Sequence, residues 1–263
     1  MDMGLTGKVA VITGGSDGIG KAAAMSLAHE GVKVVICARR PENLEKAALE
    51  IKAATGSEVM TVPTDITSPA DIDVLFEKVV EAHGRVDILV NNAGTSAAGV
   101  FDTVSDETWK YDFELKVFGA IRCSNKVIPL MKSQGGGRII NITTPGGKAP
   151  AAGSVPTSVS RAAGIALTKE MSKDYAKDNI LVNTVCIGLI KSMQHERRWE
   201  AANEKDSNIT LDAWYEEMGK NVPLGRVGDA KEAGDLITFL VSDRAAFITG
   251  VSVNIDGGAS PVV

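Results

Sequence analysis

A glycine-rich turn separates a β-branched segment, Val9–Thr13, from an alanine-rich segment, Lys21–Glu30. Gly14, Gly18 and Gly20 in this turn permit a tight bend, close approach of the backbone to a pyrophosphate, and close packing of a helix on a strand. The amino end of that helix offers free N–H groups and a positive dipole end to phosphates. A strand, this turn and a helix in that order predict the first unit of a dinucleotide-binding fold.

Short strands and longer helices continue to alternate along the chain. Further strands are expected at residues 33–37, 58–63, 88–91, 138–142 and 181–186. Helices are expected at residues 41–55 and 69–83. Two longer helices are expected after these, one before and one after the strand at 138–142. This order predicts a parallel sheet covered on both faces, in a single-domain, doubly wound α/β fold of the Rossmann type over residues 1–263. Residues 191–210 are polar and weakly patterned, and we expect an irregular, mobile substrate flap there.

Charge and cysteine content exclude some classes of protein. The net charge of −5 argues against a nucleic-acid partner, which would require a basic face. No apolar run is long enough to span a membrane. The three cysteines lack the spacing of a metal site, so we expect no metal, and reduced, packed thiols in a cytoplasmic protein.

Several motifs in order resemble the short-chain dehydrogenase/reductase family. They are the glycine spacing at 13–20, NNAG at 91–94, GRIINIT at 137–143 and FITGVSVNIDGG at 247–258. The resemblance covers nearly the whole chain. It implies a seven-stranded parallel sheet, a nicotinamide dinucleotide, a small-molecule substrate and a homo-oligomer, either tetramer or dimer.

The resemblance also implies which residues contact the cofactor. Asp65 and Ile66 match positions that meet adenine, and Asn92 and Gly94 match those beside the adenine ribose. Ile190 matches a residue near the nicotinamide amide. The complete set of expected cofactor contacts is Gly14, Ser16, Gly18, Ile19, Gly20, Arg39, Asp65, Ile66, Asn92, Gly94, Arg161 and Ile190.

The end of the second strand favours NADP(H) over NAD(H). Ala38 stands where a chain that binds NAD would carry an acid for the ribose 2′-hydroxyl. Arg39 could bind a 2′-phosphate with two charge-assisted hydrogen bonds, and Ser16 could add another. Asp17 argues the other way, because many users of NADP have a basic residue at that position of the turn. A solvent-exposed helix start is the alternative explanation of Arg39 and Arg40.

The chain departs from the family at all four catalytic positions that the resemblance implies. The family's serine, tyrosine, lysine and asparagine correspond to Thr144, Thr157, Arg161 and Lys116. The three tyrosines, at 111, 175 and 215, are followed four residues later by leucine, asparagine and glycine. No alternative alignment therefore supplies the family's YxxxK motif.

These replacements change the proton chemistry. Thr144 keeps a hydroxyl for a substrate oxygen, whereas Thr157 is far less acidic than a phenol, whose pKa is about 10. Arg161 keeps a positive charge and could hold ribose hydroxyls, but it does not release a proton at ordinary pH. Lys116 is a candidate donor, because a neighbouring Arg161 and a cationic nicotinamide should lower its pKa. A purely structural lysine is its alternative.

Residues outside these positions add further candidates. His195, in the expected flap, could exchange a proton near neutrality, or simply face solvent among charged neighbours. Arg197 and Arg198 could bind a carboxylate or phosphate, or lie on a solvated helix face. Lys148 could meet substrate or lie on the surface.

Three functions remain open at this point. The leading one is an NADP(H)-linked oxidoreductase for a carbonyl or alcohol, with a non-standard active site. A non-redox enzyme such as a lyase, hydrolase or isomerase could reuse the same pocket. A catalytically silent cofactor-binding subunit is the third.

Overall fold

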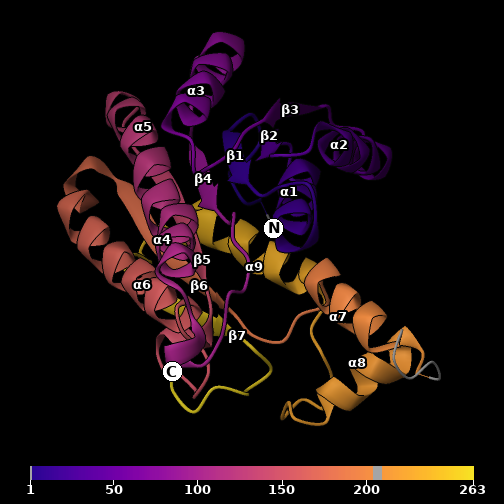
Figure 1. Cartoon of the computed structure of the whole chain (residues 1–263). Coiled ribbons are helices and arrows are strands. Elements are labelled where there is room, and N and C mark those ends of the chain that lie inside the picture. The colour runs from indigo at the N-terminus through magenta and orange to yellow at the C-terminus, as the bar shows by residue number, and fades with distance from the viewer. Residues whose placement is uncertain (1, 204–208) are drawn as a thin grey trace.

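Seven parallel strands form one sheet in the computed structural model, which describes residues 2–203 and 209–263 (Figure 1). The strand order is β3-β2-β1-β4-β5-β6-β7, so the chain reverses its direction of travel across the sheet between β1 and β4. The strands are β1 Val9–Thr13, β2 Lys33–Ala38, β3 Val59–Pro63, β4 Ile88–Asn91, β5 Gly137–Thr143, β6 Ile180–Ile187 and β7 Ser252–Ile255. The expected doubly wound, seven-stranded fold is confirmed.

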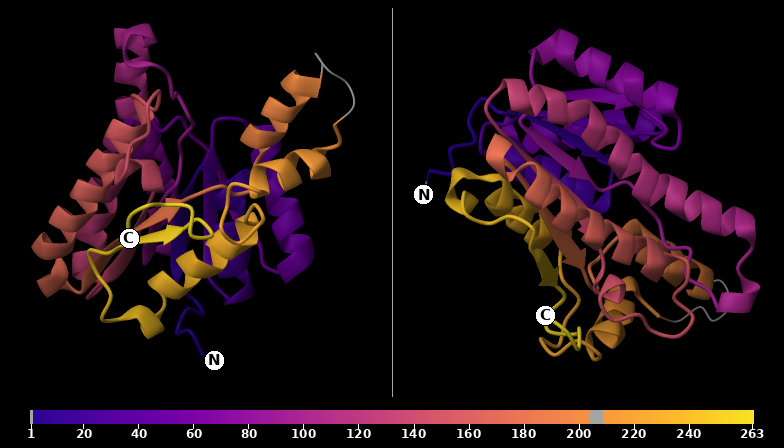
Figure 2. Two further views of the ribbon diagram at one scale, coloured as in Figure 1. Left: turned by 90° about the horizontal axis from the view of Figure 1, so that it is seen from below. Right: turned by 90° about the vertical axis from the view of Figure 1, so that its left-hand side faces the viewer.

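Helices cover both faces of the sheet (Figures 1 and 2). One layer contains α1 Gly18–His29, α2 Pro41–Thr55 and α9 Ala230–Val241. The other contains α3 Pro69–His83, α4 Asp106–Phe113, α5 Gly119–Ser133 and α6 Thr157–Asp174.

Strand β1 shows why the central strands are apolar throughout. Ala10 and Ile12 pack in the hydrophobic cluster of the first layer, whereas Val9 and Val11 pack in that of the second. All four side chains are at most 1% exposed, because successive residues of a strand point to opposite faces. The sheet is therefore a rigid platform whose carboxyl edge carries the loops.

The expectation of irregular structure is wrong over most of residues 191–210, whereas the role of this segment as a mobile substrate flap stays a prediction. Helix α7, Met193–Asn203, occupies it, and α8, Leu211–Gly219, follows (Figures 1 and 2). Most α7 residues have good helix propensity, but none is buried, so the helix lacks the apolar stripe by which helices are identified in a sequence. Residues 204–208 of the expected flap lie outside the described residues.

The cysteines behave as expected. Cys37, Cys123 and Cys186 are unpaired and buried. Burial raises the pKa of the Cys37 thiol to about 12, which makes this group unreactive at neutral pH. Within the part of the chain that the structure describes, no helix is both long and apolar enough to cross a membrane.

Candidate active site

Two adjoining cavities lie at the carboxyl edge of the sheet, next to the point where the strand order reverses between β1 and β4. This is where open α/β sheets bind their ligands. The larger, here called the main cavity, has a volume of about 470 Å³, and the smaller, the side cavity, about 180 Å³. Both include Gly14 and Gly94, so they form one continuous cleft across the glycine-rich turn.

The structure brings nearly all predicted site residues to this cleft. Those that line the main cavity are Gly14, Gly18, Ile19, Asn92, Gly94, Thr144, Thr157, Arg161, Ile190 and His195. Those that line the side cavity are Gly14, Ser16, Arg39, Asp65, Ile66 and Gly94. Gly20 and Lys116 line neither cavity, but each contacts residues that do.

Close contacts are seen at two of the glycines, one with backbone and one with a side chain. A Cβ on Gly20 would lie 2.3 Å from the carbonyl oxygen of Gly14, so only glycine lets α1 begin directly against the turn. Asn92 fixes that turn, since its Nδ2 donates to the carbonyls of Thr13 and Gly14 at 2.9 and 3.0 Å. A Cβ on Gly94 would lie 2.8 Å from Arg161 Nη2. These contacts keep the floor of the cleft free of side chains, as a dinucleotide requires.

An ion pair between Lys116 and Asp112 lies behind the wall of the main cavity. Each side chain is 1% exposed, and Lys116 Nζ donates to Asp112 Oδ1. Lys116 belongs to a π-helical turn, Glu114–Phe118, between α4 and α5, and such turns are frequent at functional sites. Asp112 Oδ2 also accepts a 2.5 Å hydrogen bond from Ser160 Oγ, which ties α4 to α6.

The charge state of Lys116 is shifted by its surroundings. The pKa of Lys116 is lowered from 10.5 to about 8, mainly by burial and also by the nearby Arg161 guanidinium, while the Asp112 carboxylate opposes both effects. The lowered pKa agrees with the prediction from the sequence, but burial contributes more than the neighbouring positive charge.

Thr157 connects this ion pair to the cavity. Its Oγ1 accepts hydrogen bonds from the Ala97 N–H at 3.0 Å and from Lys116 Nζ at 3.2 Å. A hydroxyl oxygen has two lone pairs and one proton, so both lone pairs are occupied and the proton remains to be donated. Since Thr157 lines the main cavity, a ligand oxygen there is its available acceptor.

Arg161 and Thr144 complete this part of the wall. Arg161 Nη1 donates to the Ile142 carbonyl at 2.6 Å, and burial lowers the pKa of the guanidinium to about 10, which still leaves it charged at neutral pH. Thr144 follows β5 and is half-buried. Among the described residues its hydroxyl has no hydrogen-bond partner, so it is available to a ligand.

His195 and Lys148 differ in their outcomes. His195 lines the main cavity from α7, and burial, followed by the positive charge of Arg198, lowers its pKa. It is therefore mostly neutral at pH 7. The suggestion that Lys148 meets substrate is wrong, because its Nζ donates to the Ser252 carbonyl at 2.6 Å and to Asn254 Oδ1 at 2.7 Å. It fastens its loop to β7.

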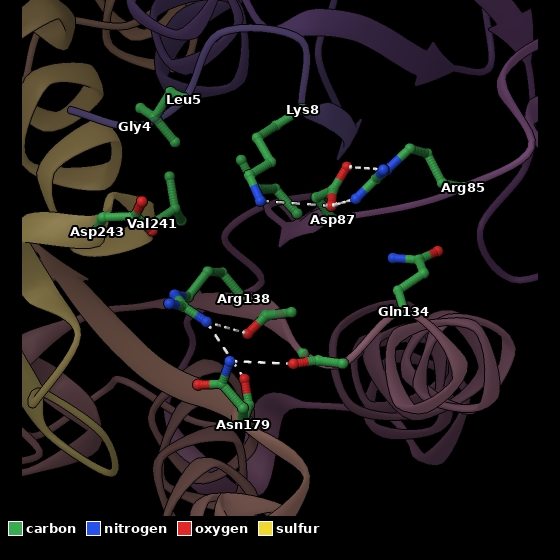
Figure 3. A pocket seen from close by; sticks show the side chains of 14 residues that line it. Gly4, Leu5, Lys8, Arg85, Asp87, Gln134, Arg138, Asn179, Val241 and Asp243 are labelled. Atoms are coloured by element: carbon green, nitrogen blue, oxygen red, sulfur yellow. Dashed lines mark hydrogen bonds and ion pairs between the residues drawn. The ribbon is translucent and has the colours of Figure 1, made fainter. Parts of the chain in front are cut away.

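A third hollow, of about 120 Å³, lies at the opposite, amino edge of the sheet (Figure 3). Arg85 binds Asp87 through two hydrogen bonds of 2.6 and 2.9 Å, and Lys8 lies 3.9 Å from the same carboxylate. Asp87 also accepts from the Val9 N–H at 2.9 Å, and Arg138 donates to neighbouring backbone carbonyls. The charged groups of this hollow therefore bind one another and the backbone at the beginnings of the strands.

Comparison with known proteins now decides the family. The family model described as short chain dehydrogenase matches residues 8–203. The oxidoreductase UcpA of Escherichia coli O157:H7 is 34% identical over 257 residues, which are 97% of this chain and 95% of the relative. The chain belongs to the short-chain dehydrogenase family.

Two further relatives show what kind of short-chain dehydrogenase this is similar to. The 3-oxoacyl-[acyl-carrier-protein] reductase FabG of Thermotoga maritima is 33% identical over 97% of this chain and 99% of its own. The structure of L-sorbose reductase from Gluconobacter frateurii, complexed with NADPH and L-sorbose, matches with a TM-score of 0.95 at 34% identity and covers 100% of both chains. The chain is an NAD(P)(H)-dependent oxidoreductase of this type, and the non-redox and silent alternatives are not favoured.

Sequence reasoning missed two residues of this site. Asp112 precedes Lys116 by four residues, a spacing that brings helical side chains together, and this was the available signal. Ser160 precedes Arg161 on α6, and no pattern in the sequence links it to Asp112. Their contact depends on the packing of α4 against α6.

Proposed function

We propose that this short-chain dehydrogenase uses NADPH to reduce the carbonyl group of a small polyhydroxy ketone, through an altered catalytic tetrad. The observation that carries the proposal is the hydrogen-bonded series from Asp112 through Lys116 to Thr157, which ends at the wall of the main cavity. The similarity to L-sorbose reductase, whose complex contains NADPH and L-sorbose, supports the cofactor and the class of substrate.

The side cavity fits the phosphorylated ribose of NADP(H). Ser16, Ala38, Arg39 and Arg40 line it, so the end of β2 contributes two guanidinium groups and no carboxylate. Asp65 also lines it, but this carboxylate accepts hydrogen bonds from the backbone and hydroxyl of Thr67, at 2.9 and 2.8 Å. Donors and positive charge suit a 2′-phosphate better than a 2′-hydroxyl.

We expect NADPH to bind more tightly than NADH. Hydrogen bonds to a charged group contribute about 1.5–3 kcal/mol each, so Arg39→Ala should weaken NADPH binding about 10- to 100-fold. The same variant should leave NADH binding nearly unchanged, which is the internal control. Calorimetric titration of both cofactors measures this. Equal or tighter binding of NADH by the parent, or no loss in Arg39→Ala, would contradict the preference.

The chain's own residues supply the proton. NADPH, when bound, provides the hydride for the carbonyl carbon. The carbonyl oxygen then takes the Thr157 hydroxyl proton, and Thr157 Oγ1 takes a proton from Lys116 Nζ along the existing 3.2 Å hydrogen bond. Lys116 becomes neutral and is reprotonated from solvent, so the reverse reaction, alcohol oxidation, begins with neutral Lys116.

Two further residues orient and stabilise the reacting oxygen. Thr144 also lines the main cavity, at the position where the family has a serine, and can donate a hydrogen bond to the substrate carbonyl. Arg161 would hold the ribose hydroxyls of the cofactor, and its permanent charge favours negative charge on the oxygen. In this proposal Arg161 is a positioning and electrostatic group that keeps its proton.

The direct test supplies the purified protein with NADPH and with L-sorbose, related ketoses or simple ketones. The loss of NADPH absorbance measures the rate of reduction of each compound. We expect ketoses to be reduced faster than simple ketones, because hydroxyl-bearing side chains of the main cavity can hydrogen-bond to the hydroxyl groups of a ketose. Failure to reduce any carbonyl compound, with NADPH shown to bind, would contradict the proposed function.

Assembly and location belong to the same proposal. The family resemblance suggests a homo-oligomer, either a dimer or a tetramer, and the exposed Phe118 and Phe247 side chains are suited to contacts between subunits. A cytoplasmic location is supported by three cysteines that are all unpaired.

A further inference from the structure

Helix α7 presents one of its two adjacent arginines to the main cavity. Gln194, His195 and Arg198 line the cavity, whereas Arg197 does not. Residues three and four apart share a helix face, so His195 and Arg198 form one stripe and Arg197 points elsewhere. Helix α7 therefore contributes one cationic side chain, Arg198, to the lining of the main cavity.

No acidic residue lies three or four positions from Arg198 on α7. The residues three and four positions away are His195, Gln194, Ala201 and Ala202. Arg197, by contrast, has Glu200 three residues later. Among the described residues, Arg198 makes no ion pair within 4.0 Å. A guanidinium that lines a cavity, with no ion pair to a carboxylate of residues 2–203 or 209–263, suits an anionic group of a ligand.

The other charged groups of the cavity have different partners or places. Asp17, the only carboxylate among the described lining residues, lies at the start of α1 on the dinucleotide turn. Arg161 is fixed to the Ile142 carbonyl beside Thr157. His195 is mostly neutral at pH 7, so it can hydrogen-bond to a substrate without adding charge. The positive charge available at the α7 side is therefore that of Arg198.

We propose that the substrate is a hydroxylated carbonyl compound that bears a carboxylate or phosphate group, and that Arg198 binds this group. The proposal rests on the proposed reductase function and specifies its substrate class. The hydroxyl-bearing side chains Thr95, Ser96 and Ser192 of the same cavity are available to the hydroxyl groups of such a substrate. Arg198 is then a specificity-determining residue, and the neutral ketose is the poorer substrate.

Substrates that differ by one group test this. L-sorbose is the neutral member. The two keto acids formed by oxidising either terminal hydroxymethyl group of L-sorbose to a carboxylate are the anionic members, with L-sorbose 6-phosphate as the phosphate member. Initial rates of NADPH oxidation by the purified protein give kcat and KM for each substrate. We expect KM to be at least about tenfold lower for one or more anionic members than for L-sorbose, as for a hydrogen bond to a charged group.

Arg198→Met and Arg197→Met form a matched pair of variants. Arg198→Met should remove the preference for the anionic substrate over L-sorbose, mainly through KM, whereas Arg197→Met should keep it. The parent's preference should also weaken between low and high ionic strength, because Arg198 is exposed to solvent. Whether a keto acid or the phosphate ester is preferred identifies the anion.

Failures of the two proposals look different. If L-sorbose is reduced as well as every anionic member, or if the anionic preference persists in Arg198→Met, the substrate class is wrong and the reductase function stands. If none of the carbonyl compounds is reduced although NADPH binds, the proposed function itself is wrong.

Discussion

Replacing Lys116 with methionine should lower the rate of carbonyl reduction by about 10²- to 10⁴-fold, the usual contribution of a well-placed general acid. Binding of NADPH should change little, because Lys116 lines neither cavity of the cleft. The rate should fall because Thr157 can give up its proton only if another proton replaces it, and Lys116 Nζ is its hydrogen-bonded donor. Single-turnover rates and calorimetric titration separate the two effects.

The pH dependence provides a second readout. Because the pKa of Lys116 is about 8, reduction should decline as the pH rises through about 8 and the ammonium loses its proton. Alcohol oxidation requires the neutral amine and should rise over the same range. If Lys116 only supported the fold, neither the rate of carbonyl reduction nor the rate of alcohol oxidation would change as the pH passes through about 8.

Two variants guard against misinterpretation of the Lys116 result. Lys116→Met alone leaves Asp112 as a buried, unpaired charge and could unfold the protein, so Asp112→Asn should be combined with it to remove both charges together. His195→Gln tests the other candidate donor and should keep most of the activity. If Lys116→Met and the double variant both match the parent, the proton series proposed here is wrong. Loss of activity in His195→Gln alone would assign the donation to α7.

The dinucleotide half of the site could be predicted from the sequence, whereas the proton-donating half could be predicted only in part. Gly14 and Gly20 act through backbone geometry within a few residues, so their spacing is sufficient to identify the turn. The bonds of Thr157 come from Ala97 on a loop and Lys116 on another helix, and only the folded chain brings these together. The same is true of burial, which is the main cause of the shifted pKa of Lys116.

Helix α7 shows a different limit of sequence reasoning. Periodicity identifies a helix by the apolar face that it buries, and α7 buries no residue. His195 and Arg198 were nevertheless recognised as candidates from their chemistry alone. That they share one face of a helix, and that this face borders the main cavity, required the structure.

Replacing Asp112 should have the largest effect on stability. Removing one partner of a buried ion pair costs about 3–5 kcal/mol, because the other charge remains buried without compensation. Asp112 has a second partner in Ser160, so Asp112→Ala should lose at least this much of the free energy of unfolding. Asp112→Asn keeps the size and one acceptor oxygen and should lose less. Urea denaturation at pH 7 measures both.

The same carboxylate should also control the proton series. Asp112 stabilises the charged form of Lys116, so Asp112→Asn should lower the pKa of Lys116 below its present value of about 8. Reduction should then decline at a lower pH than in the parent. In the parent, Lys116 binds fewer protons in the folded state than in the unfolded state between pH of about 8 and 10.5. Its contribution therefore makes the free energy of unfolding rise with pH over this range. In Asp112→Asn this rise should begin at a lower pH.

Ser160→Ala is the matched control for Asp112→Asn. It removes the 2.5 Å hydrogen bond to Asp112 Oδ2 but leaves the carboxylate charge next to Lys116. It should therefore lower stability while the alkaline decline of reduction stays close to that of the parent. If Asp112→Asn and Ser160→Ala shift the decline equally, or if neither shifts it, Asp112 holds the helices together without setting the protonation of Lys116. A shift confined to Asp112→Asn would show that the carboxylate itself, rather than its hydrogen bond with Ser160, sets the protonation of Lys116.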